Sequence, residues 1–282
     1  HAHLLAATLG VAISLPCMSQ TKIEYLKEEP SKGTLPLGKV VYVDDGSEDD
    51  SVSRLRGFAA TLPRAPDGTE RLRVFASPRR NGKPTALNIG IHLARGSLIA
   101  LVDADCDVQY GSFHHWIRPF EDERVGAVAA NIRVRNANAS LLARLQDCEY
   151  AINVTLSRAW RAALDLLAIV PGAGGMFRAS IIRKLGGFDT GLGDDTDMTL
   201  KLRKAGWKLA FAMRAVVWTD VPTRWRVLLR QRSRWCRATD RRWRFHRSIR
   251  PSTRDAQGSP VQQMAGLRPR GRLGVRGVDG LS

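Results

Sequence analysis

Two short apolar runs, each followed directly by aspartates, constrain the fold of this chain more than any other feature. The runs cover residues 39–43 and 98–102, and the aspartates that follow them are Asp44, Asp45, Asp103 and Asp105. Runs of this length, bounded by turn formers, are typical of strands buried in a sheet. Parallel strands end at one edge of their sheet, where the ligands of open α/β proteins bind. The pattern therefore predicts an α/β fold with four carboxylates along one rim.

Strand and helix patterns alternate along the rest of the chain. Further strands are predicted at 72–76, 125–132, 207–211 and 216–219, and helices at 54–62, 84–95 and 195–205. This alternation indicates a mostly parallel central sheet. From Ser140 onward, apolar residues spaced by 4, 3, 4 and 4 positions predict one face of a long helix, and these residues are Leu141, Leu145, Cys148, Ile152 and Leu156.

The chain is predicted to consist of four segments. Residues 39–220 form the α/β core, and residues 221–250 form a basic, tryptophan-bearing helix or helix pair. Residues 1–38 are predicted to be irregular. Residues 251–282 are predicted to be disordered, because proline, glycine, serine and arginine recur there without periodicity. The apolar stretch 4–18 leaves two interpretations open: an ordinary apolar segment, or the core of a signal or membrane anchor.

Composition narrows the class of protein. Hydrophobic residues make up 44% of the chain and charged residues 25%, which suits a packed core and excludes wholly disordered, collagen-like and disulfide-scaffold proteins. No stretch reaches the roughly 18 apolar residues of a membrane-spanning helix. Charge is uneven, because residues 221–282 contain 16 arginines and 3 aspartates. This basic region predicts an anionic partner: phosphate, nucleic acid or acidic lipid.

The predicted rim of carboxylates indicates a cation. Four carboxylates repel one another unless positive charge lies among them. Mg²⁺ or Mn²⁺ fits this need, because hard divalent cations prefer oxygen ligands and bridge to substrate phosphates. Lys83 stands at the start of the predicted helix 84–95, where an ammonium and backbone N–H groups suit a phosphate. The alternatives are aspartates that only form turns and a solvated lysine.

Two further polar clusters lie later in the chain. Asp194, Asp195 and Asp197 begin a predicted helix. Helix capping explains one or two of these acids, whereas a crowded carboxylate with a raised pKa would suit a general base. Residues 231–235 combine phosphate-binding donors with an indole on which a sugar can stack. The alternative for this second cluster is a basic surface helix.

Seven motifs follow one another between residues 39 and 247. They are Val-Asp-Asp-Gly-Ser (43–47), Asn-Gly-Lys with Ala-Leu-Asn (81–83, 86–88), Asp-Ala-Asp (103–105), Pro-Gly-Ala-x-Gly-x-Phe-Arg (171–178), Gly-Gly-Phe-Asp (186–189), Asp-Asp-Thr-Asp (194–197) and Gln-Arg-x-Arg-Trp (231–235). Their order resembles the processive family-2 glycosyltransferases, the inverting, membrane-associated synthases of cellulose, chitin, hyaluronan and poly-N-acetylglucosamine type. The resemblance implies a GT-A type nucleotide-sugar-binding domain followed by basic amphipathic helices.

The resemblance also implies a donor side of the site. Asp44 and Asp45 would meet the uracil and ribose of a UDP-sugar, and Lys83 would lie near the nucleotide. Asp103 and Asp105 would bind the metal, Mg²⁺ or Mn²⁺, and the diphosphate, with Asp105 as the more direct metal ligand.

An acceptor side is implied in the same way. Asp195 would be the base that takes the proton from the acceptor hydroxyl, and one base without a nucleophilic carboxylate gives inversion. Gly174 and Gly175 would pass close to the acceptor, a polysaccharide or oligosaccharide, and Trp235 would stack under its sugar. The residues that would hold the diphosphate are Gln231, Arg232 and Arg234.

Two features of the family are not recognisable in the sequence. Residues 1–38 show no opening strand with its following proline loop, and the flanking membrane helices have no counterpart. Three interpretations follow: the chain is a fragment, it needs a membrane-spanning partner subunit, or it is inactive. The basic segment 223–250 separately predicts binding to an acidic membrane surface at the cytoplasmic face of the cell membrane. Trp225, Leu228, Leu229 and Trp235 fall near one helical face, as in a helix that lies in a membrane interface. The alternative is that this face packs on the domain's own core.

The expected activity is metal-dependent transfer of a sugar from a UDP-sugar to a growing β-linked polysaccharide. Three alternatives remain: a non-processive transferase that acts on a lipid or protein, a catalytically degenerate homologue, and, remotely, a basic nucleic-acid-binding protein. No nucleic-acid-binding motif is present, so no nucleic-acid partner is expected.

Overall fold

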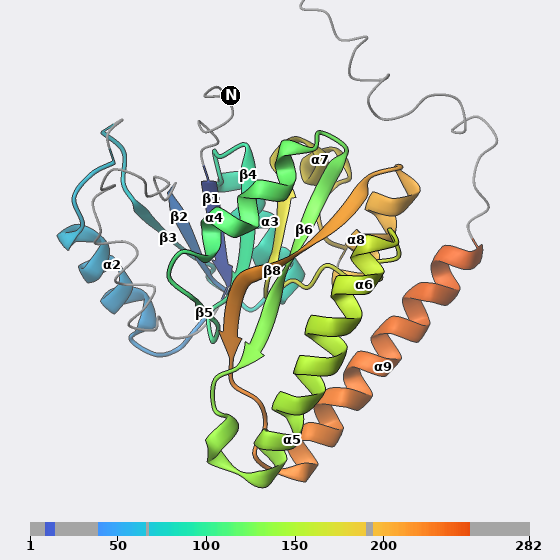
Figure 1. The fold of residues 1–282 in the computed structure, drawn as a ribbon. Coiled ribbons are helices and arrows are strands. Elements are labelled where there is room, and N and C mark those ends of the chain that lie inside the picture. Colours follow the sequence, from blue (N-terminus) through green and yellow to red (C-terminus); the bar gives the residue numbers. More distant parts are fainter. Residues whose placement is uncertain (1–8, 15–38, 66–67, 190–193, 249–282) are drawn as a thin grey trace, which may run out of the picture.

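The computed structural model describes residues 9–14, 39–65, 68–189 and 194–248 (Figure 1). In this part of the chain eight strands form one sheet, in the order β3-β2-β1-β4-β7-β6-β8-β5. The strands are β1 (Leu9–Ser14), β2 (Val40–Asp44), β3 (Leu72–Ala76), β4 (Leu98–Asp103), β5 (Asp107–Val108), β6 (Val125–Val134), β7 (Gly175–Arg178) and β8 (Lys208–Thr219). The sheet is parallel across β3-β2-β1-β4, as predicted. It is mixed beyond β4, because β7 runs antiparallel to both of its neighbours.

Helices connect and cover these strands. They are α2 (Ser51–Thr61), α3 (Lys83–Leu93), α4 (Ser112–Ile117), α5 (Leu141–Glu149), α6 (Ser157–Ala163), α7 (Ala179–Lys184), α8 (Asp194–Lys204) and α9 (Trp225–Ser248). Shorter 3₁₀ turns occupy Arg118–Glu121 and Ala137–Ala139, and a π-helical segment, η3, occupies Tyr150–Leu156.

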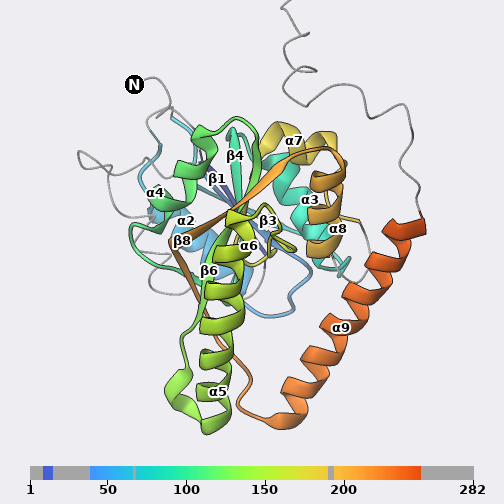
Figure 2. The same ribbon diagram turned by 45° about the vertical axis from the view of Figure 1, so that its right-hand side comes forward.

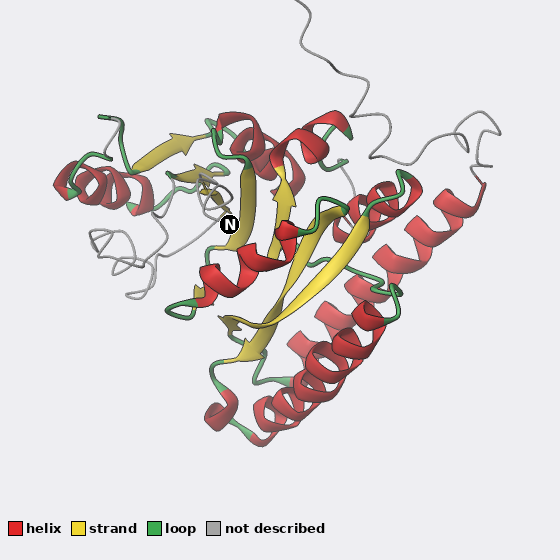
Figure 3. Ribbon diagram, turned by 45° about the horizontal axis from the view of Figure 1, so that its top comes forward, coloured by secondary structure: helices red, strands yellow, loops and turns green. Residues whose placement is uncertain are grey.

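The central strands are buried on both faces. In β4, Ala100 and Val102 pack into a core cluster with side chains of α2 and α4. Ile99 and Leu101 point the other way, into a cluster with side chains of α3, α7 and α8. Helices therefore lie on both faces of the sheet (Figure 3). This two-sided burial is the physical reason for the unbroken apolar run of residues 98–102.

Residues 9–14 form β1 in the middle of the sheet, so the prediction of an irregular segment over 1–38 is wrong for these six residues. The strand pairs in parallel with β2 and with β4, and Ser14 lies opposite both Val43 and Asp103. Residues 9–13 are apolar throughout, as expected of a strand in the centre of a parallel sheet. Among the described residues, the α/β core therefore includes residues 9–14 in addition to the predicted 39–220.

Most other elements agree with the sequence pattern within a few residues. β3 matches its predicted bounds of 72–76, and α2 starts three residues earlier than the predicted 54. The two short strands predicted at 207–211 and 216–219 are instead one strand, β8. Its pairing with β6 shifts register between Ala130 and Asn131, and this irregularity lets the strand continue.

The long helix predicted from residue 140 is divided, and its apolar face is turned to the solvent. A π-helical segment, η3, separates α5 from α6. Leu141 and Leu156 are 74% and 61% exposed. The inward side of α5 carries Leu142, Ala143 and Gln146 instead. Periodicity thus identified a shared helical face correctly, but that face is not part of the core.

The basic segment forms one helix, α9, of 24 residues. Leu228 is buried, whereas Trp225 and Leu229 are 61% and 60% exposed and Trp235 is 39% exposed. The four residues predicted to share a face therefore have different environments, because one edge of α9 packs on the domain. None of the described helices is long and apolar enough to cross a membrane. The tail predicted to be disordered, 251–282, lies outside the described residues.

Candidate active site

The first aspartate after β2 fixes the loop that follows it. Asp44 Oδ2 accepts hydrogen bonds from the backbone N–H groups of Gly46 at 3.1 Å and Ser47 at 3.0 Å. Its other oxygen, Oδ1, is buried and has no hydrogen-bond partner among the described residues. Leaving a buried acceptor without a partner costs free energy. This atom is therefore a candidate acceptor for a donor group of a ligand.

A chain of contacts joins the ends of β2 and β4. The carboxylate of Asp45 accepts hydrogen bonds from the backbone N–H groups of Asn81 at 2.8 Å and Gly82 at 2.9 Å. The next residue, Lys83, is the first of α3, and its Nζ lies 2.8 Å from Asp103 Oδ2. The structure therefore brings together four of the predicted donor-side residues at one rim of the sheet. Asp105 lies just beyond the end of β4 and is exposed.

Asp195 lies in the first turn of α8 and packs against the glycine-rich loop. A Cβ atom at Gly172 would overlap Asp195 Oδ1, so only glycine leaves room for this carboxylate. The Thr199 hydroxyl donates to the Asp195 carbonyl at 2.7 Å and accepts from the backbone N–H of Val170 at 2.9 Å. These bonds hold the loop against the helix. The third acid of the cluster, Asp197, is fully buried and pairs with Lys201 at 3.0 Å.

Gly174 and Gly175 lie deeper in the same loop and are buried. A Cβ at Gly174 would touch Ile132, and a Cβ at Gly175 would come within 2.6 Å of the Pro171 carbonyl oxygen. Both glycines therefore allow β7 to enter the sheet. Their predicted contact with an acceptor stays a prediction.

Two residues outside the seven motifs interact electrostatically with Asp195 or with the end of β4. Arg158, on α6, is within electrostatic range of Asp195 and of Tyr150. Tyr150, at the start of η3, is in turn within electrostatic range of Arg158 and of Cys106, the neighbour of Asp105. Burial raises the pKa of the Tyr150 phenol.

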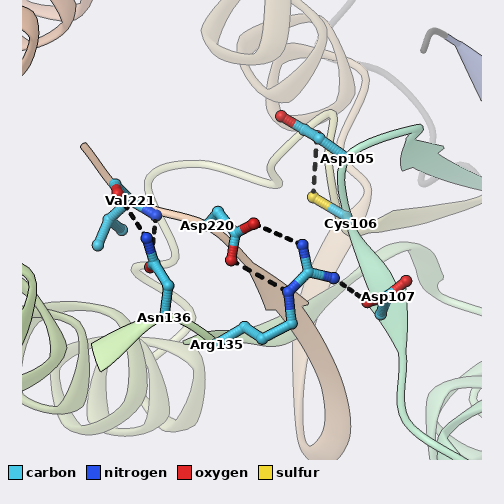
Figure 4. Close-up of polar contacts among 7 residues, drawn as sticks. All are labelled: Asp105, Cys106, Asp107, Arg135, Asn136, Asp220 and Val221. Atoms are coloured by element: carbon cyan, nitrogen blue, oxygen red, sulfur yellow. Dashed lines mark hydrogen bonds and ion pairs between the residues drawn. The ribbon is translucent and has the colours of Figure 1, made fainter. Parts of the chain in front are cut away.

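An ion-pair cluster supports the loop that carries Asp105 (Figure 4). Arg135 donates to Asp220 through Nε at 3.0 Å and Nη2 at 2.6 Å, and its Nη1 pairs with Asp107. The bond to Asp220 raises the pKa of the Arg135 guanidinium. The next residue, Asn136, exchanges two hydrogen bonds of 2.9 Å with the backbone of Val221. These contacts join β5, the end of β6 and the segment that leads into α9.

Helix α9 is tethered to α5. Gln146 Nε2 donates to the Pro222 carbonyl at 2.8 Å, and Arg232 Nη2 pairs with Glu149 at 2.7 Å. The Arg232 guanidinium also stacks over the Trp235 ring, 4.7 Å from its centroid. The first turns of α9 consequently stay near α5 while the helix runs outward (Figure 2). Of the residues predicted to hold a diphosphate, Arg232 thus has a protein partner, while Arg234 is exposed and Gln231 is half-buried.

Two of the seven motifs form a clamp. Asn88 Nδ2 donates to the Phe188 carbonyl at 2.7 Å, and Asn88 Oδ1 accepts from the Phe188 N–H at 2.8 Å. Gly187 has φ +70°, and a Cβ there would overlap Asn88 Oδ1. The Ala-Leu-Asn and Gly-Gly-Phe-Asp motifs therefore connect α3 to the segment before α8.

A family model described as glycosyltransferase-like family 2 matches residues 32–238, well over half of the chain. The chain belongs to this family. A probable glycosyltransferase, YdaM, from Bacillus subtilis is 34% identical over 158 residues, which cover 55% of this chain and 38% of the relative. An N-acetylglucosaminyltransferase from Rhizobium meliloti is 28% identical, covering 72% and 48% of the two chains. A poly-β-1,6-N-acetyl-D-glucosamine synthase from Staphylococcus aureus is 27% identical, covering 80% and 53%. This family-2 chain thus spans about half the length of these relatives, or less.

Solved structures support the GT-A type fold of this family-2 domain. A mannosyltransferase from Pyrobaculum calidifontis, in complex with GDP-mannose and Mn²⁺, matches with a TM-score of 0.64 and 21% identity, covering 92% of this chain and 69% of that one. The structure of GalNAc-T7 with UDP, GalNAc and Mn²⁺ matches with a TM-score of 0.57 and 19% identity, covering 76% and 44%. The predicted fold class and the prediction of a glycosyltransferase are confirmed.

The donor set at the rim suits a cation that shares its ligands with a substrate. In the part of the chain that the structure describes, no group of three His, Cys, Asp or Glu side chains is placed to hold a metal ion. Asp103 and Asp105 offer two carboxylates. Magnesium-like cations are commonly held by one or two carboxylates together with substrate phosphates and water, so the residues present fit such a site in this family-2 domain.

The sequence motifs missed the residues that support the site. Arg158, Tyr150, Arg135 and Glu149 lie outside all seven motifs and act through partners far away in the chain, such as Asp220, which is 85 residues from Arg135. Among these supporting residues, Asp107 could have been noticed in the sequence, because it continues the alternation of Asp103 and Asp105.

Proposed function

We propose that this family-2 glycosyltransferase transfers a sugar from a UDP-sugar to a hydroxyl of a growing β-linked polysaccharide, with inversion at the anomeric carbon. One observation carries the proposal. The backbone N–H groups of Asn81 and Gly82 hold Asp45, and the adjacent Lys83 pairs with Asp103, so polar groups suited to a nucleotide gather at one rim of the sheet. A transferase needs nucleotide-binding groups and a base on either side of one sugar.

The roles of the chain's own residues follow from this arrangement. Asp44 Oδ1 accepts a hydrogen bond from the nucleoside, and Lys83 adds positive charge near the diphosphate. Asp195 takes the proton of the acceptor hydroxyl. The hydroxyl oxygen then forms a bond to the anomeric carbon, and the bond from that carbon to the diphosphate breaks with its electron pair. A single displacement of this kind converts an α-linked donor into a β-linked product.

The residues of α9 have three roles in this proposal. Gln231 and Arg234 hold the diphosphate, because charged donors stabilise the charge that develops on a leaving group. Trp235 stacks under the acceptor sugar. Arg232 keeps α9 in place through Glu149, a role that differs from the phosphate contact expected from the resemblance.

Asp103 and Asp105 would hold Mg²⁺ or Mn²⁺. When bound, such a cation supplies positive charge to the leaving diphosphate. The Mn²⁺ in the two neighbouring structures supports this assignment for the fold, and the choice between Mg²⁺ and Mn²⁺ is part of the test.

UDP release with a panel of donors tests the proposed function. UDP-N-acetylglucosamine comes first, because two relatives carry N-acetylglucosamine in their names. GDP-mannose is the matched control for the nucleotide, because the archaeal neighbour binds it. Release of UDP with Mg²⁺ or Mn²⁺ is expected. If no UDP is released with any donor, the proposal is contradicted, and the protein is instead a catalytically degenerate homologue.

The length of a labelled product separates the two kinds of transferase. A ladder of long products is expected from the proposed polymerising activity. A single added sugar on a lipid or protein acceptor would instead identify the non-processive alternative.

We also propose that the protein binds the acidic, cytoplasmic surface of a cell membrane. Trp225 and Leu229 are exposed on α9 beside exposed arginines at 224, 226 and 230. Along α5 and η3, Leu141, Ile152 and Leu156 add further exposed apolar side chains. Each basic residue near an anionic membrane is worth about 1 kcal/mol, and inserted apolar side chains add to this.

Co-sedimentation with vesicles tests this second proposal. Binding to phosphatidylserine-containing vesicles at low salt is expected, with loss of binding in the double variant Trp225→Ser/Leu229→Ser. Phe75→Ser is the matched control, because Phe75 is a 40% exposed apolar residue on β3. Protein that stays in solution with anionic vesicles contradicts the proposal. These exposed apolar side chains would then be expected to contact a membrane-spanning partner subunit instead.

A further inference from the structure

Asp107 is a buried carboxylate that the mechanism above does not use, although it lies next to the proposed metal ligands in the chain. It stands two residues beyond Asp105, at the start of β5. Its Oδ2 pairs with Arg135, whereas its Oδ1 is buried without a hydrogen-bond partner among the described residues. A buried ion pair with an unsatisfied oxygen adds little to the stability of a fold. A role for this pair is therefore to be sought in what it holds in place.

The loop that carries Asp105 is held by a short backbone ladder. The Asp105 side chain is exposed and contacts Cys106 Sγ at 3.5 Å. The Cys106 N–H donates to the Asp103 carbonyl at 3.0 Å, which closes the turn after β4. Strand β5 has two residues and lies at the edge of the sheet, where it pairs with β8. Because this ladder is so short, a side-chain anchor at Asp107 matters for the position of the loop.

Arg135 is a well-fixed partner for Asp107 at the end of β6. Its backbone N–H donates to the Thr219 carbonyl at 2.9 Å, and its guanidinium donates to both carboxylate oxygens of Asp220. A guanidinium is a planar fork of donors, so it holds the carboxylates that it binds in a defined geometry. This one side chain ties the loop that carries Asp105 to the segment between β8 and α9 (Figure 4).

We propose that Asp107 is a positioning residue that fixes Asp105 for the binding of a divalent cation. The inference rests on the proposed function, in which Asp103 and Asp105 hold the metal. Magnesium-like cations demand a narrow ligand geometry, and residues that orient metal ligands change metal affinity by about 10–100-fold. Asp107 acts through two residues of backbone rather than by contact with Asp105, so we expect an effect at the lower end of this range.

Binding of Mn²⁺ in the presence of UDP tests this role in the wild-type protein and in Asp107→Asn. The amide keeps the size of the side chain and removes the charge that pairs with Arg135. We expect the affinity for Mn²⁺, measured from the electron paramagnetic resonance of the free ion, to fall about tenfold. Asp105→Ala supplies the background, because it removes a proposed metal ligand.

Asp122→Asn is the matched control, because Asp122 also pairs with an arginine through both of its oxygens, just before β6 begins. Its affinity for Mn²⁺ is expected to equal that of the wild-type protein. If Asp107→Asn binds Mn²⁺ as tightly as wild type and only melts at a lower temperature, Asp107 is merely structural and the proposal is wrong. The proposal is also wrong if the wild-type protein binds no more Mn²⁺ than Asp105→Ala does.

Hydrogen exchange in the wild-type protein covers the case in which Asp107→Asn does not fold. If the loop is held before a metal binds, the backbone amides of residues 106–109 exchange slowly without Mn²⁺, and added Mn²⁺ and UDP change their exchange little. Exchange as fast as in the exposed residues 48–50, with protection only after the metal is added, would show that the metal orders the loop and would overturn the proposal.

These measurements need no turnover, so they separate the positioning role from the proposed function. A protein whose affinity for Mn²⁺ depends on Asp107 but which releases no UDP from any donor contradicts the proposed function alone. Normal release of UDP, together with an unchanged affinity for Mn²⁺ in Asp107→Asn, contradicts the positioning role alone.

Discussion

The two halves of the molecule hold their polar side chains in different ways. In the N-terminal half, residues 9–108, Asp44 and Asp45 are held by backbone N–H groups of adjacent loops. In the C-terminal half, residues 125–248, ion pairs between side chains, such as Arg135 with Asp220 and Arg232 with Glu149, are among the contacts that hold α9 and the segment before it. The C-terminal half also carries most of the exposed large apolar side chains.

This difference indicates that the two halves have different roles in the proposed reaction. Backbone donors next to rigid strands hold a carboxylate in one geometry, as recognition of a nucleotide requires. Ion pairs between long, partly exposed side chains are weaker and depend on salt. We therefore expect substitutions in the N-terminal half to change donor and metal binding, and those in the C-terminal half to change turnover.

The largest effect is expected from Asp105→Ala. It removes an exposed carboxylate proposed to hold the metal, so metal-dependent UDP release is abolished while the fold is retained. Circular dichroism checks the fold and a coupled assay checks UDP release. Asp49→Ala is the control, because it removes another exposed carboxylate of the same half. Full wild-type turnover in excess chelator would contradict the metal role.

Asp195→Asn is expected to lower kcat by roughly 10²–10⁴, the usual contribution of a general base. Binding of the UDP-sugar, measured by calorimetry, should stay near wild type, because the change lies in the C-terminal half. Asp165→Asn, at an exposed position, is the control. Near-normal turnover in Asp195→Asn would show that the base is elsewhere.

Gly172→Ala is expected to lower kcat by about 10²-fold, because the added Cβ overlaps Asp195 Oδ1 and moves the carboxylate. Gly57→Ala is a matched control, since a Cβ there meets nothing within 4 Å. If kcat of Gly172→Ala is unchanged while donor affinity falls, the proposed division between the two halves is wrong.

Asn88→Ala probes the clamp between the halves and should act on stability. It leaves the backbone N–H and carbonyl of Phe188 without their partner, at a cost of about 1–3 kcal/mol for each group that stays buried. The free energy of unfolding in urea measures this cost. Asn153→Ala, at an exposed position, serves as the control and should be close to neutral. If Asn88→Ala and the wild-type protein have equal free energies of unfolding, the hydrogen bonds between Asn88 and Phe188 do not contribute to stability.

Local patterns predicted the rim well, because each strand and the aspartates after it are adjacent in the chain. β1 was missed for the opposite reason: the segment 15–38 separates it from β2, so no strand-to-aspartate pattern marked it. The exposure of Leu141 and Ile152 also could not be predicted from the sequence, because periodicity shows which residues share a helical face but not whether that face is covered by the rest of the protein. The partners of Arg135 and Arg158 depend on contacts between distant segments, which no local spacing encodes.

The pairing of β5 has a consequence for the order in which a newly made chain folds. Asp107 and Val108 pair with Trp218 and Val217 of β8, more than 100 residues later. At ordinary rates of translation, on the order of ten seconds separate the synthesis of the two strands. The four parallel strands at the other end of the sheet are synthesised well before β8. The loop that carries Asp105 can reach its final contacts only after β8 and Asp220 have been made. A nascent chain released before residue 220 would therefore have a nearly finished parallel half of the sheet, while the loop that carries Asp105 would lack the contacts that hold it.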